Sequence, residues 1–202
     1  MLKYLNKWAV FICIVGLGLS SCNSQESIDE FCAGTTIDDY RPDFTIWCPA
    51  QGEDYFIPLR YGCPPSGEGV SLPIAWKGIP QGTTHLRIVL LDATCVLHCN
   101  SHCKRANWQI EIPLEEIGKS SSISDGVLAE GANQDPVVIS WTLPNEGGMK
   151  TYSPLCPPME KVHAYILRGI AYRYEAERSI ILGRCQSAPL LFSTAGKKGP
   201  NS

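Results

Sequence analysis

Three cysteines and two histidines fall within one short stretch of the chain, Cys95-Val96-Leu97-His98-Cys99-Asn100-Ser101-His102-Cys103. If this stretch is helical, a spacing of four places the cysteines on one face and the histidines on an adjacent stripe. Thiolates and imidazoles are ligands of zinc and copper, so His98, His102, Cys99 and Cys103 are candidate metal ligands. Zinc ligands, however, usually come as two C-x2-4-C pairs set apart. We therefore favour disulfides here and predict no bound metal and no cofactor.

Cysteine is frequent throughout the chain, with 10 in 202 residues. Cys13 lies in the apolar N-terminal segment, and Cys22 is assigned below to a lipid. The remaining cysteines form an even set, which in an exported chain is typical of disulfides. These disulfide candidates are Cys32, Cys48, Cys63, Cys95, Cys99, Cys103, Cys156 and Cys185. The sequence predicts up to four bridges, and it does not give their connectivity.

Motifs of common hydrolases do not occur in the sequence. No serine lies in a G-x-S-x-G turn, and there is no H-E-x-x-H motif. Asp92 and His163 could act as an acid and base pair. No nucleophile accompanies them, because we expect the cysteines to be bridged. The sequence therefore predicts a protein that is not an enzyme.

Short runs of apolar, β-branched and aromatic residues alternate with Gly, Pro and Ser clusters, as β-strands alternate with turns. The runs are 44–47, 54–59, 85–91, 108–112, 137–141, 163–172 and 179–182. Residues 114–117 are expected to begin a helical turn, and no long segment has the 3.6-residue period of a helix. This pattern predicts a mostly β fold of the sandwich type.

The N-terminus has the composition of an export signal. Lys3 and Lys7 precede an apolar run over 8–19, which is too short to span a bilayer comfortably. Leu19-Ser20-Ser21-Cys22 resembles a bacterial lipobox, so we predict acylation of Cys22, with palmitate-type chains that hold the protein to a membrane. The alternative interpretation is an ordinary secretory signal, with Cys22 paired in a disulfide.

These features predict the organisation of the whole chain. The predicted parts are a lipoprotein signal peptide over 1–21, a lipid-anchored tether over 22–37, one domain over 38–190 and a flexible tail over 191–202. Asn23 after the acylated cysteine favours the outer membrane of a bacterial cell envelope, facing the periplasm. About 180 mature residues are enough for one well-cored domain.

The charge balance argues against a nucleic acid partner. The formal net charge is -3, from 17 basic and 20 acidic residues. It becomes minus 5 without residues 1–21, because that segment contains two lysines and no acid. Nucleic acid binding requires a basic surface for the phosphate backbone, which an acidic chain of this kind lacks.

Two proline-rich blocks lie far apart in the chain. The first is Ser71-Leu72-Pro73-Ile74-Ala75-Trp76-Lys77-Gly78-Ile79-Pro80, preceded by Ile57-Pro58-Leu59-Arg60-Tyr61-Gly62-Cys63. The second is Tyr152-Ser153-Pro154-Leu155-Cys156-Pro157-Pro158, followed by His163-Ala164-Tyr165. Proline fixes the backbone, so such loops can hold a pocket open. In order and spacing, both blocks resemble the signatures of the phosphatidylethanolamine-binding family, including its bacterial Raf-kinase-inhibitor-like members.

The resemblance implies a sandwich of two antiparallel sheets with short peripheral helices, and a small anion-binding cavity at one end. The residues implied to line this cavity are Asp92, His163, Tyr165, Pro157, Pro158 and Asn107. Several family positions have changed: Thr94 stands where a second acid is expected, and Ala164 where an arginine is expected. The family's pocket histidine is absent, with Ala106 or Asn107 in its place according to where one gap is set.

The polar residues of the implied cavity also have a purely structural interpretation. Asp92 could simply cap a turn, and His163 could be a satisfied interior histidine. His98 or His102 could replace the lost pocket histidine, because the loop that carries them follows Asp92 directly. The sequence leaves these alternatives open.

Three functional hypotheses follow from the sequence. The first is a non-enzymatic, lipid-anchored protein that binds a small anion or a phospholipid headgroup. The second is a protease or kinase-type inhibitor that uses the same loops to bind a protein partner. The third is metal capture by the Cys/His-rich stretch.

Overall fold

The computed structural model describes residues 39–98, 106–124, 126–145, 148–158, 161–176 and 178–195, with the side chains of 96–98 excepted. The predicted signal peptide, the tether, Cys22, Cys32, Cys99, Cys103 and His102 lie outside these ranges, as does the side chain of His98. Within the described ranges, no helix is long and apolar enough to cross a membrane.

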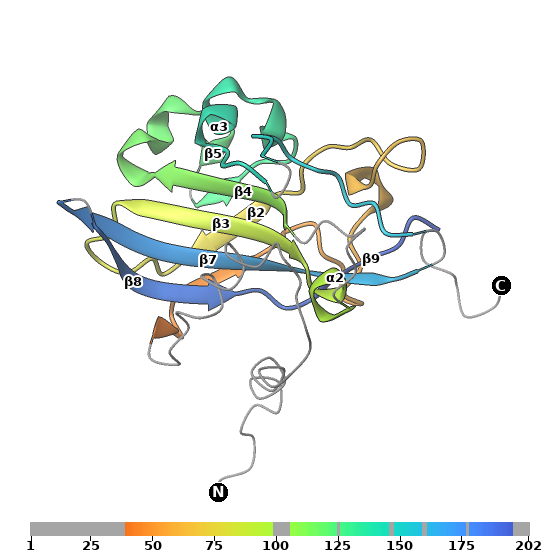
Figure 1. Ribbon diagram of the computed structural model, residues 1–202, viewed down its shortest axis with the longest axis horizontal. Coiled ribbons are helices and arrows are strands. Elements are labelled where there is room, and N and C mark those ends of the chain that lie inside the picture. The colour runs from red at the N-terminus through yellow and green to blue at the C-terminus, as the bar shows by residue number, and fades with distance from the viewer. Residues whose placement is uncertain are drawn as a thin grey trace, which may run out of the picture. The chain divides into compact units, whose positions relative to one another are not determined.

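The larger sheet is built from the long strands of the chain (Figure 1). Its order is β4 (Ala106–Pro113), β3 (His85–Asp92), β7 (His163–Glu175) and β8 (Arg178–Gln186). A short fifth strand, β9 (Leu190–Phe192), pairs with the start of β7. All neighbouring strands are antiparallel, and the pairing of β3 with β7 runs from His85 opposite Tyr172 to Asp92 opposite Tyr165.

The smaller sheet contains shorter strands in the order β1 (Thr45–Trp47), β2 (Ile74–Lys77), β6 (Val127–Leu128) and β5 (Ile123–Ser124). These strands are also antiparallel. The prediction of a mostly β fold with two antiparallel sheets and a few short helices is therefore confirmed.

The hydrophobic core takes alternate residues from the strands of both sheets, as the two-residue period of a strand requires. Strand β3 contributes Leu86, Ile88 and Leu90, all of them almost fully buried. The core is so closely packed at Gly169 that a Cβ atom there would lie 2.7 Å from Sγ of Cys185. Only glycine fits at this point without displacing a neighbour.

Short helices connect the strands. They are η2 (Leu59–Tyr61), α2 (Ala93–His98), η3 (Leu114–Lys119), η4 (Ala132–Gln134) and α3 (Pro136–Trp141). The strand predicted over 137–141 is wrong, because this run forms α3. The carboxylate of Asp135 accepts the N–H of Val137 at 2.8 Å, and Pro136 occupies the first turn. An aspartate cap followed by proline is typical of the start of a helix. This start determines the helical structure of a run that is mostly apolar and has no clear period.

Two other predicted boundaries differ from the structure. The run 54–59 forms no named strand: Phe56 makes an isolated bridge to Leu191, and η2 begins at Leu59. Leu191 and Phe192, which we expected in a flexible tail, belong to β9. Burial alternates along β9, so Leu191 is partly exposed and Phe192 is buried against the core.

The described cysteines are only partly bridged. Cys63 pairs with Cys156, and Cys95 is also disulfide-bonded. Cys48 and Cys185 are free, buried thiols, so the expectation that both would form disulfides is wrong. Burial raises the pKa of Cys48 from 9.0 to about 11 and that of Cys185 from 9.0 to about 12. A thiol that is both inaccessible and neutral behaves as a small hydrophobic side chain.

These raised thiol pKa values predict a loss of stability in alkali. As the pH rises, the two thiols ionise earlier in the unfolded chain than in the folded one. Their contribution to stability is therefore complete below pH 9 and falls as the pH rises through about 11. Each thiol should account for on the order of 2 kcal/mol. Urea denaturation at several pH values between about 7.5 and 10.5 measures the slope, which Cys185→Ala should reduce. A stability that does not fall over this range would contradict the prediction.

Candidate functional site

Asp92 stands at the junction between β3 and α2, and it uses both carboxylate oxygens. One oxygen, Oδ2, lies 2.7 Å from Nδ1 of His163. The other, Oδ1, accepts the backbone N–H of Cys95 at 2.9 Å and so caps the first turn of α2. Asp92 and His163 are 4% and 5% exposed, so this is a buried pair in which each residue satisfies one polar atom of the other. The cap on the first turn of α2 is the role that the structural interpretation of Asp92 predicts.

His163 and Tyr165 lie on the same face of β7, as strand alternation predicts. Their ring centroids are 6.4 Å apart, and both residues are buried. Strand β9 holds this end of β7, with His163 opposite Phe192 and Tyr165 opposite Leu190. Burial raises the pKa of Tyr165, and the neighbouring Asp92 carboxylate raises it further. Tyr165 therefore keeps its hydroxyl proton, which takes part in a side-chain hydrogen bond with Asp92.

Thr94 and Ala164 meet across the junction of α2 and β7. Thr94 Oγ1 accepts the backbone N–H of Ala164 at 2.9 Å. These are the two positions where the family resemblance implied an acid and an arginine. A neutral hydrogen bond ties the helix to the strand here, and it leaves no buried charge to compensate.

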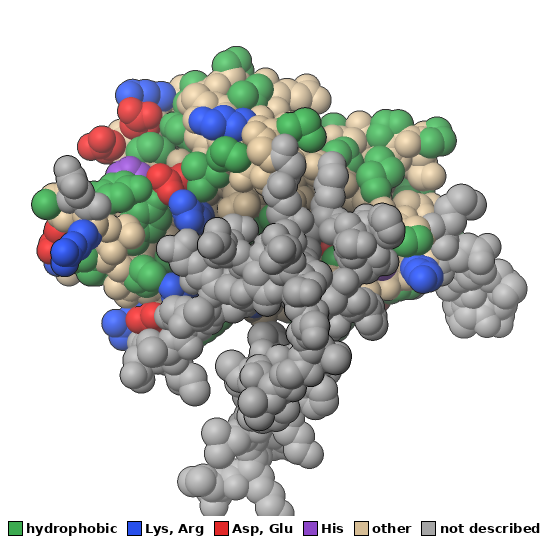
Figure 2. Space-filling view, in the orientation of Figure 1, with side chains coloured by type: hydrophobic (Ala, Val, Ile, Leu, Met, Phe, Trp, Pro, Cys, Tyr) green, Lys and Arg blue, Asp and Glu red, His purple; other side chains and the backbone are tan. Residues whose placement is uncertain are grey.

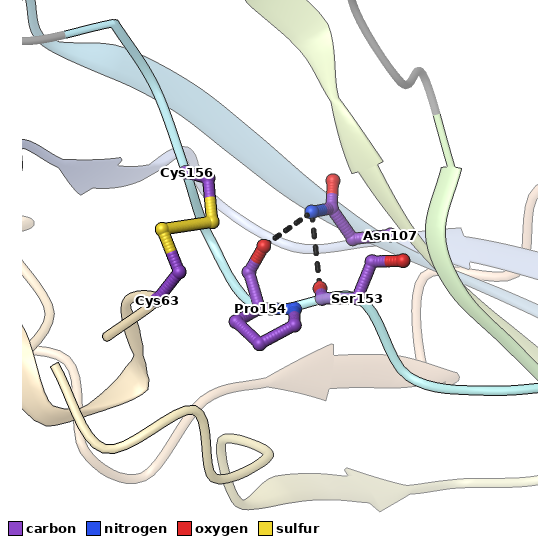
Figure 3. The surroundings of a disulfide bond; sticks show 5 residues. All are labelled: Cys63, Asn107, Ser153, Pro154 and Cys156. Atoms are coloured by element: carbon purple, nitrogen blue, oxygen red, sulfur yellow. Dashed lines mark hydrogen bonds between the residues drawn. A yellow bond between two sulfur atoms is a disulfide. The ribbon is translucent and has the colours of Figure 1, made fainter. Parts of the chain in front are cut away.

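Asn107 holds the second proline-rich loop against β4. Its Nδ2 donates to the carbonyl oxygens of Ser153 at 3.1 Å and Pro154 at 3.2 Å, as Figure 3 shows. The backbone carbonyl oxygen of Asn107 accepts the backbone N–H of Ser153 at 2.8 Å. In the register with β3, Leu90 faces Trp108 and Leu91 faces Ala106, so Asn107 is the extra residue of a bulge. The side-chain oxygen of Asn107 is buried without a hydrogen-bond partner in the described structure.

The disulfide joins the segment 57–63, which precedes the first proline-rich block, to the second block. Cys63 follows η2 and Cys156 lies in the 152–158 loop (Figure 3). Backbone hydrogen bonds run beside the bond, from Cys63 to Leu155 at 3.3 Å and from Leu155 to Tyr61 at 3.2 Å. Pro157 is buried and Pro158 is exposed. The segment 71–80, in contrast, contains β2 of the smaller sheet and does not contribute a cysteine to this crosslink.

The side chains of η2 are fixed as well. Tyr61 Oη donates to Glu130, and Arg60 Nη2 lies 2.9 Å from the other oxygen of the same carboxylate. Burial raises the pKa of Tyr61, and the Glu130 carboxylate adds to the effect. The segment 57–63 is therefore anchored by Glu130 through Arg60 and Tyr61, and by the disulfide through Cys63.

The structure brings Asp92, His163 and Tyr165 together. Asn107 lies in the bulge of the neighbouring strand β4, where it holds the 152–158 loop. Sequence analysis missed Thr94 as the residue that fastens α2, and it missed Cys95 as a neighbour of His163. The Asp92-x-x-Cys95 spacing is that of an N-cap residue and the backbone N–H that donates to it, and it was the available signal. Cys95 is disulfide-bonded and so offers His163 no thiolate nucleophile in this state.

The face seen in Figure 2 carries basic and acidic side chains close to one another among apolar ones. The described part of the chain has several exposed ion pairs, such as Arg173 with Glu175 and Lys119 with Glu116. Such pairs are worth little to stability. They do mix the two signs of charge along the described part of this surface.

Comparison with known proteins gives three findings. Residues 49–189 match the sequence model of a family described as phosphatidylethanolamine-binding protein. Among solved structures, a putative phosphatidylethanolamine-binding protein homologue, CT736 from Chlamydia trachomatis, is 18% identical, with a TM-score of 0.52 over 75% of this chain and 96% of that one. YbcL from E. coli is 14% identical, with a TM-score of 0.52 over 75% and 98%. No curated protein sequence matches.

Proposed function

Because the chain belongs to the phosphatidylethanolamine-binding protein family, we propose that it is a lipid-anchored, non-enzymatic binding protein for a small anion such as a phospholipid headgroup. The family supports a binding function in general. The observation that carries the specific proposal is the buried contact of 2.7 Å between Asp92 and His163, with Tyr165 on the same face.

The chemistry of this pair suits a phosphate or carboxylate ligand. When His163 is protonated, Nδ1–H donates to Asp92 and Nε2–H is left as a donor for an anion. Nε2 forms no hydrogen bond with any other described residue. Asp92 compensates the charge of the imidazolium, and Tyr165 adds a neutral donor. When His163 is protonated, its Nε2–H and the Tyr165 hydroxyl are two donors for a single anionic group, provided that the hydroxyl exchanges its hydrogen bond with Asp92 for one with the ligand.

The orphaned oxygen of Asn107 suggests which anions are favoured. It is a buried acceptor, and leaving such a group unpaired costs about 1–3 kcal/mol. The ammonium group of an ethanolamine headgroup is a donor that could satisfy it. We therefore propose that phosphoethanolamine binds more tightly than inorganic phosphate.

Calorimetric titration of the purified protein with phosphoethanolamine, inorganic phosphate and ethanolamine tests this proposal. His163→Gln should weaken phosphoethanolamine binding at least tenfold, because it removes the only cationic donor of the pair. His85→Gln is the matched control, since His85 lies at the opposite end of β3, stacked on Tyr172. The proposal fails if His163→Gln and His85→Gln bind phosphoethanolamine equally well.

The proposed membrane attachment has its own test. Cys22→Ala should abolish acylation and move the protein from the detergent phase to the aqueous phase in a phase-partitioning assay. Cys13→Ala changes a cysteine in the preceding apolar run and should leave partitioning unaltered. Intact-mass measurement of both proteins identifies the acyl chains. A Cys22→Ala protein that still carries lipid and still partitions into detergent would refute the assignment.

A further inference from the structure

Asp92, Cys95 and His163 bring three kinds of metal-ligating atom together. Their ligand atoms, one from each residue, all lie within 4.8 Å of one another, and the three residues are buried. In a tetrahedral zinc site, bonds of about 2.0–2.3 Å place neighbouring ligand atoms about 3.3–3.8 Å apart. Small shifts would therefore let the cluster hold an ion: the 2.7 Å contact between Asp92 and His163 must lengthen, and any separation near 4.8 Å must shorten.

The three residues come from elements that are fixed independently of Cys95's sulfur. Asp92 ends β3, Cys95 lies in the first turn of α2, and His163 begins β7 (Figure 1). The Cys95 N–H bond to Asp92 holds the turn, and Thr94 Oγ1 fastens α2 to β7. Both contacts use backbone donors and oxygen acceptors. They should persist when the disulfide of Cys95 opens.

The redox state of Cys95 decides whether the cluster can bind a metal. Cys95 is disulfide-bonded, and a disulfide sulfur is a poor ligand compared with a thiolate. We propose that reduction of this disulfide converts Asp92, Cys95 and His163 into a site for zinc or a similar divalent transition metal. The sequence hypothesis of metal capture used Cys95, Cys99, Cys103, His98 and His102, whereas this site keeps only Cys95 of these and adds Asp92 and His163.

The conversion takes two steps, reduction of the disulfide and then binding of the metal. A dithiol reductant transfers two electrons and two protons to the disulfide, and its own two sulfurs form a disulfide. The Cys95 thiol then gives its proton to solvent as the metal–sulfur bond forms. For Nδ1 of His163 to bind the metal, the proton that it shares with Asp92 must leave Nδ1, either to Nε2 of the same ring or to solvent. Three protein ligands leave a fourth position for water or an anion.

The inference does not depend on the proposed headgroup binding, although both use Asp92 and His163. Headgroup binding is measured on the oxidised protein, and metal binding on the reduced one. Either result can therefore fail without the other.

Cobalt(II) titration of the full-length protein, with and without a phosphine reductant, tests the site. The reduced protein should bind one cobalt ion per chain and show cobalt–thiolate charge-transfer absorption, and the oxidised protein should not. Cys95→Ser should remove this absorption. Asp92→Asn and His163→Ala should weaken binding at least tenfold. Cys156→Ser is the control, because this thiol is exposed and belongs to the other described disulfide.

Three results would overturn the proposal. They are reduced protein without cobalt–thiolate absorption, oxidised protein with the same affinity, and absorption that persists in Cys95→Ser or at full affinity in His163→Ala. The last result would assign the metal to other cysteines and histidines. Circular dichroism of each variant, recorded before titration, distinguishes a lost ligand from an unfolded protein, and Asp92→Asn provides the mildest change at the cluster.

Discussion

Removing the disulfide between Cys63 and Cys156 is expected to lower the free energy of unfolding by roughly 4 kcal/mol. The bond joins residues separated by 93 positions. Loop-closure entropy in the unfolded chain assigns roughly 4–5 kcal/mol to a crosslink of that span. The double change Cys63→Ser with Cys156→Ser leaves small polar side chains, and Cys156 is already exposed. Urea denaturation of both proteins without reductant measures the difference.

The disulfide at Cys95 provides an internal control for this experiment. It remains closed in both proteins without reductant, so the difference reports the Cys63–Cys156 bond. Adding reductant should then bring the original protein close to the double variant measured with reductant. A difference of less than about 1 kcal/mol between the two oxidised proteins would show that the backbone hydrogen bonds around Leu155 suffice to hold the loops.

The second large effect is expected for Asp92→Ala, which should lower the free energy of unfolding by about 3 kcal/mol. The change removes the acceptor for the N–H of Cys95 and leaves Nδ1 of His163 buried without its partner. Loss of an N-cap costs about 1 kcal/mol, and an unsatisfied buried donor costs about 1–3 kcal/mol. Phosphoethanolamine binding should be lost as well. Denaturation and calorimetry on the same protein measure both effects.

Two variants separate the contributions of Asp92. Asp92→Asn keeps an acceptor for the cap and a polar group for His163, so it should lose less than half as much stability as Asp92→Ala. Asp135→Ala removes a comparable cap from α3, a helix of the same six-residue length, without touching a histidine. It should cost about 1 kcal/mol. Equal losses for Asp92→Ala and Asp135→Ala would contradict a role for the His163 contact in stability.

The long strands of the larger sheet were predictable from the sequence, and the short elements were not. Strands β3, β4, β7 and β8 carry enough alternating or β-branched residues to be recognised. Strands β5 and β6 have two residues each, too few for any period. Helix α3 was misassigned because its apolar run has no clear alternation, and its capping residue Asp135 decides the outcome.

The candidate site was predictable only in part, and for physical reasons. The family resemblance identified Asp92, His163 and Tyr165, and the register of β3 with β7 explains why they meet. The contact from Thr94 to Ala164 uses a backbone donor, which no residue pattern reveals. Likewise, the free state of Cys48 and Cys185 depends on where the fold places each thiol, and counting cysteines gives only an upper limit on bridges.

A crystal structure of the oxidised protein soaked with phosphoethanolamine tests the central claim most directly, because it locates the ligand. We predict phosphate oxygens at hydrogen-bonding distance, about 2.7–3.2 Å, from Nε2 of His163, with the hydroxyl of Tyr165 as a second donor. The Asp92–His163 contact should remain. Phosphoethanolamine bound elsewhere, or a site closed to it at a concentration that saturates binding in solution, would contradict the account.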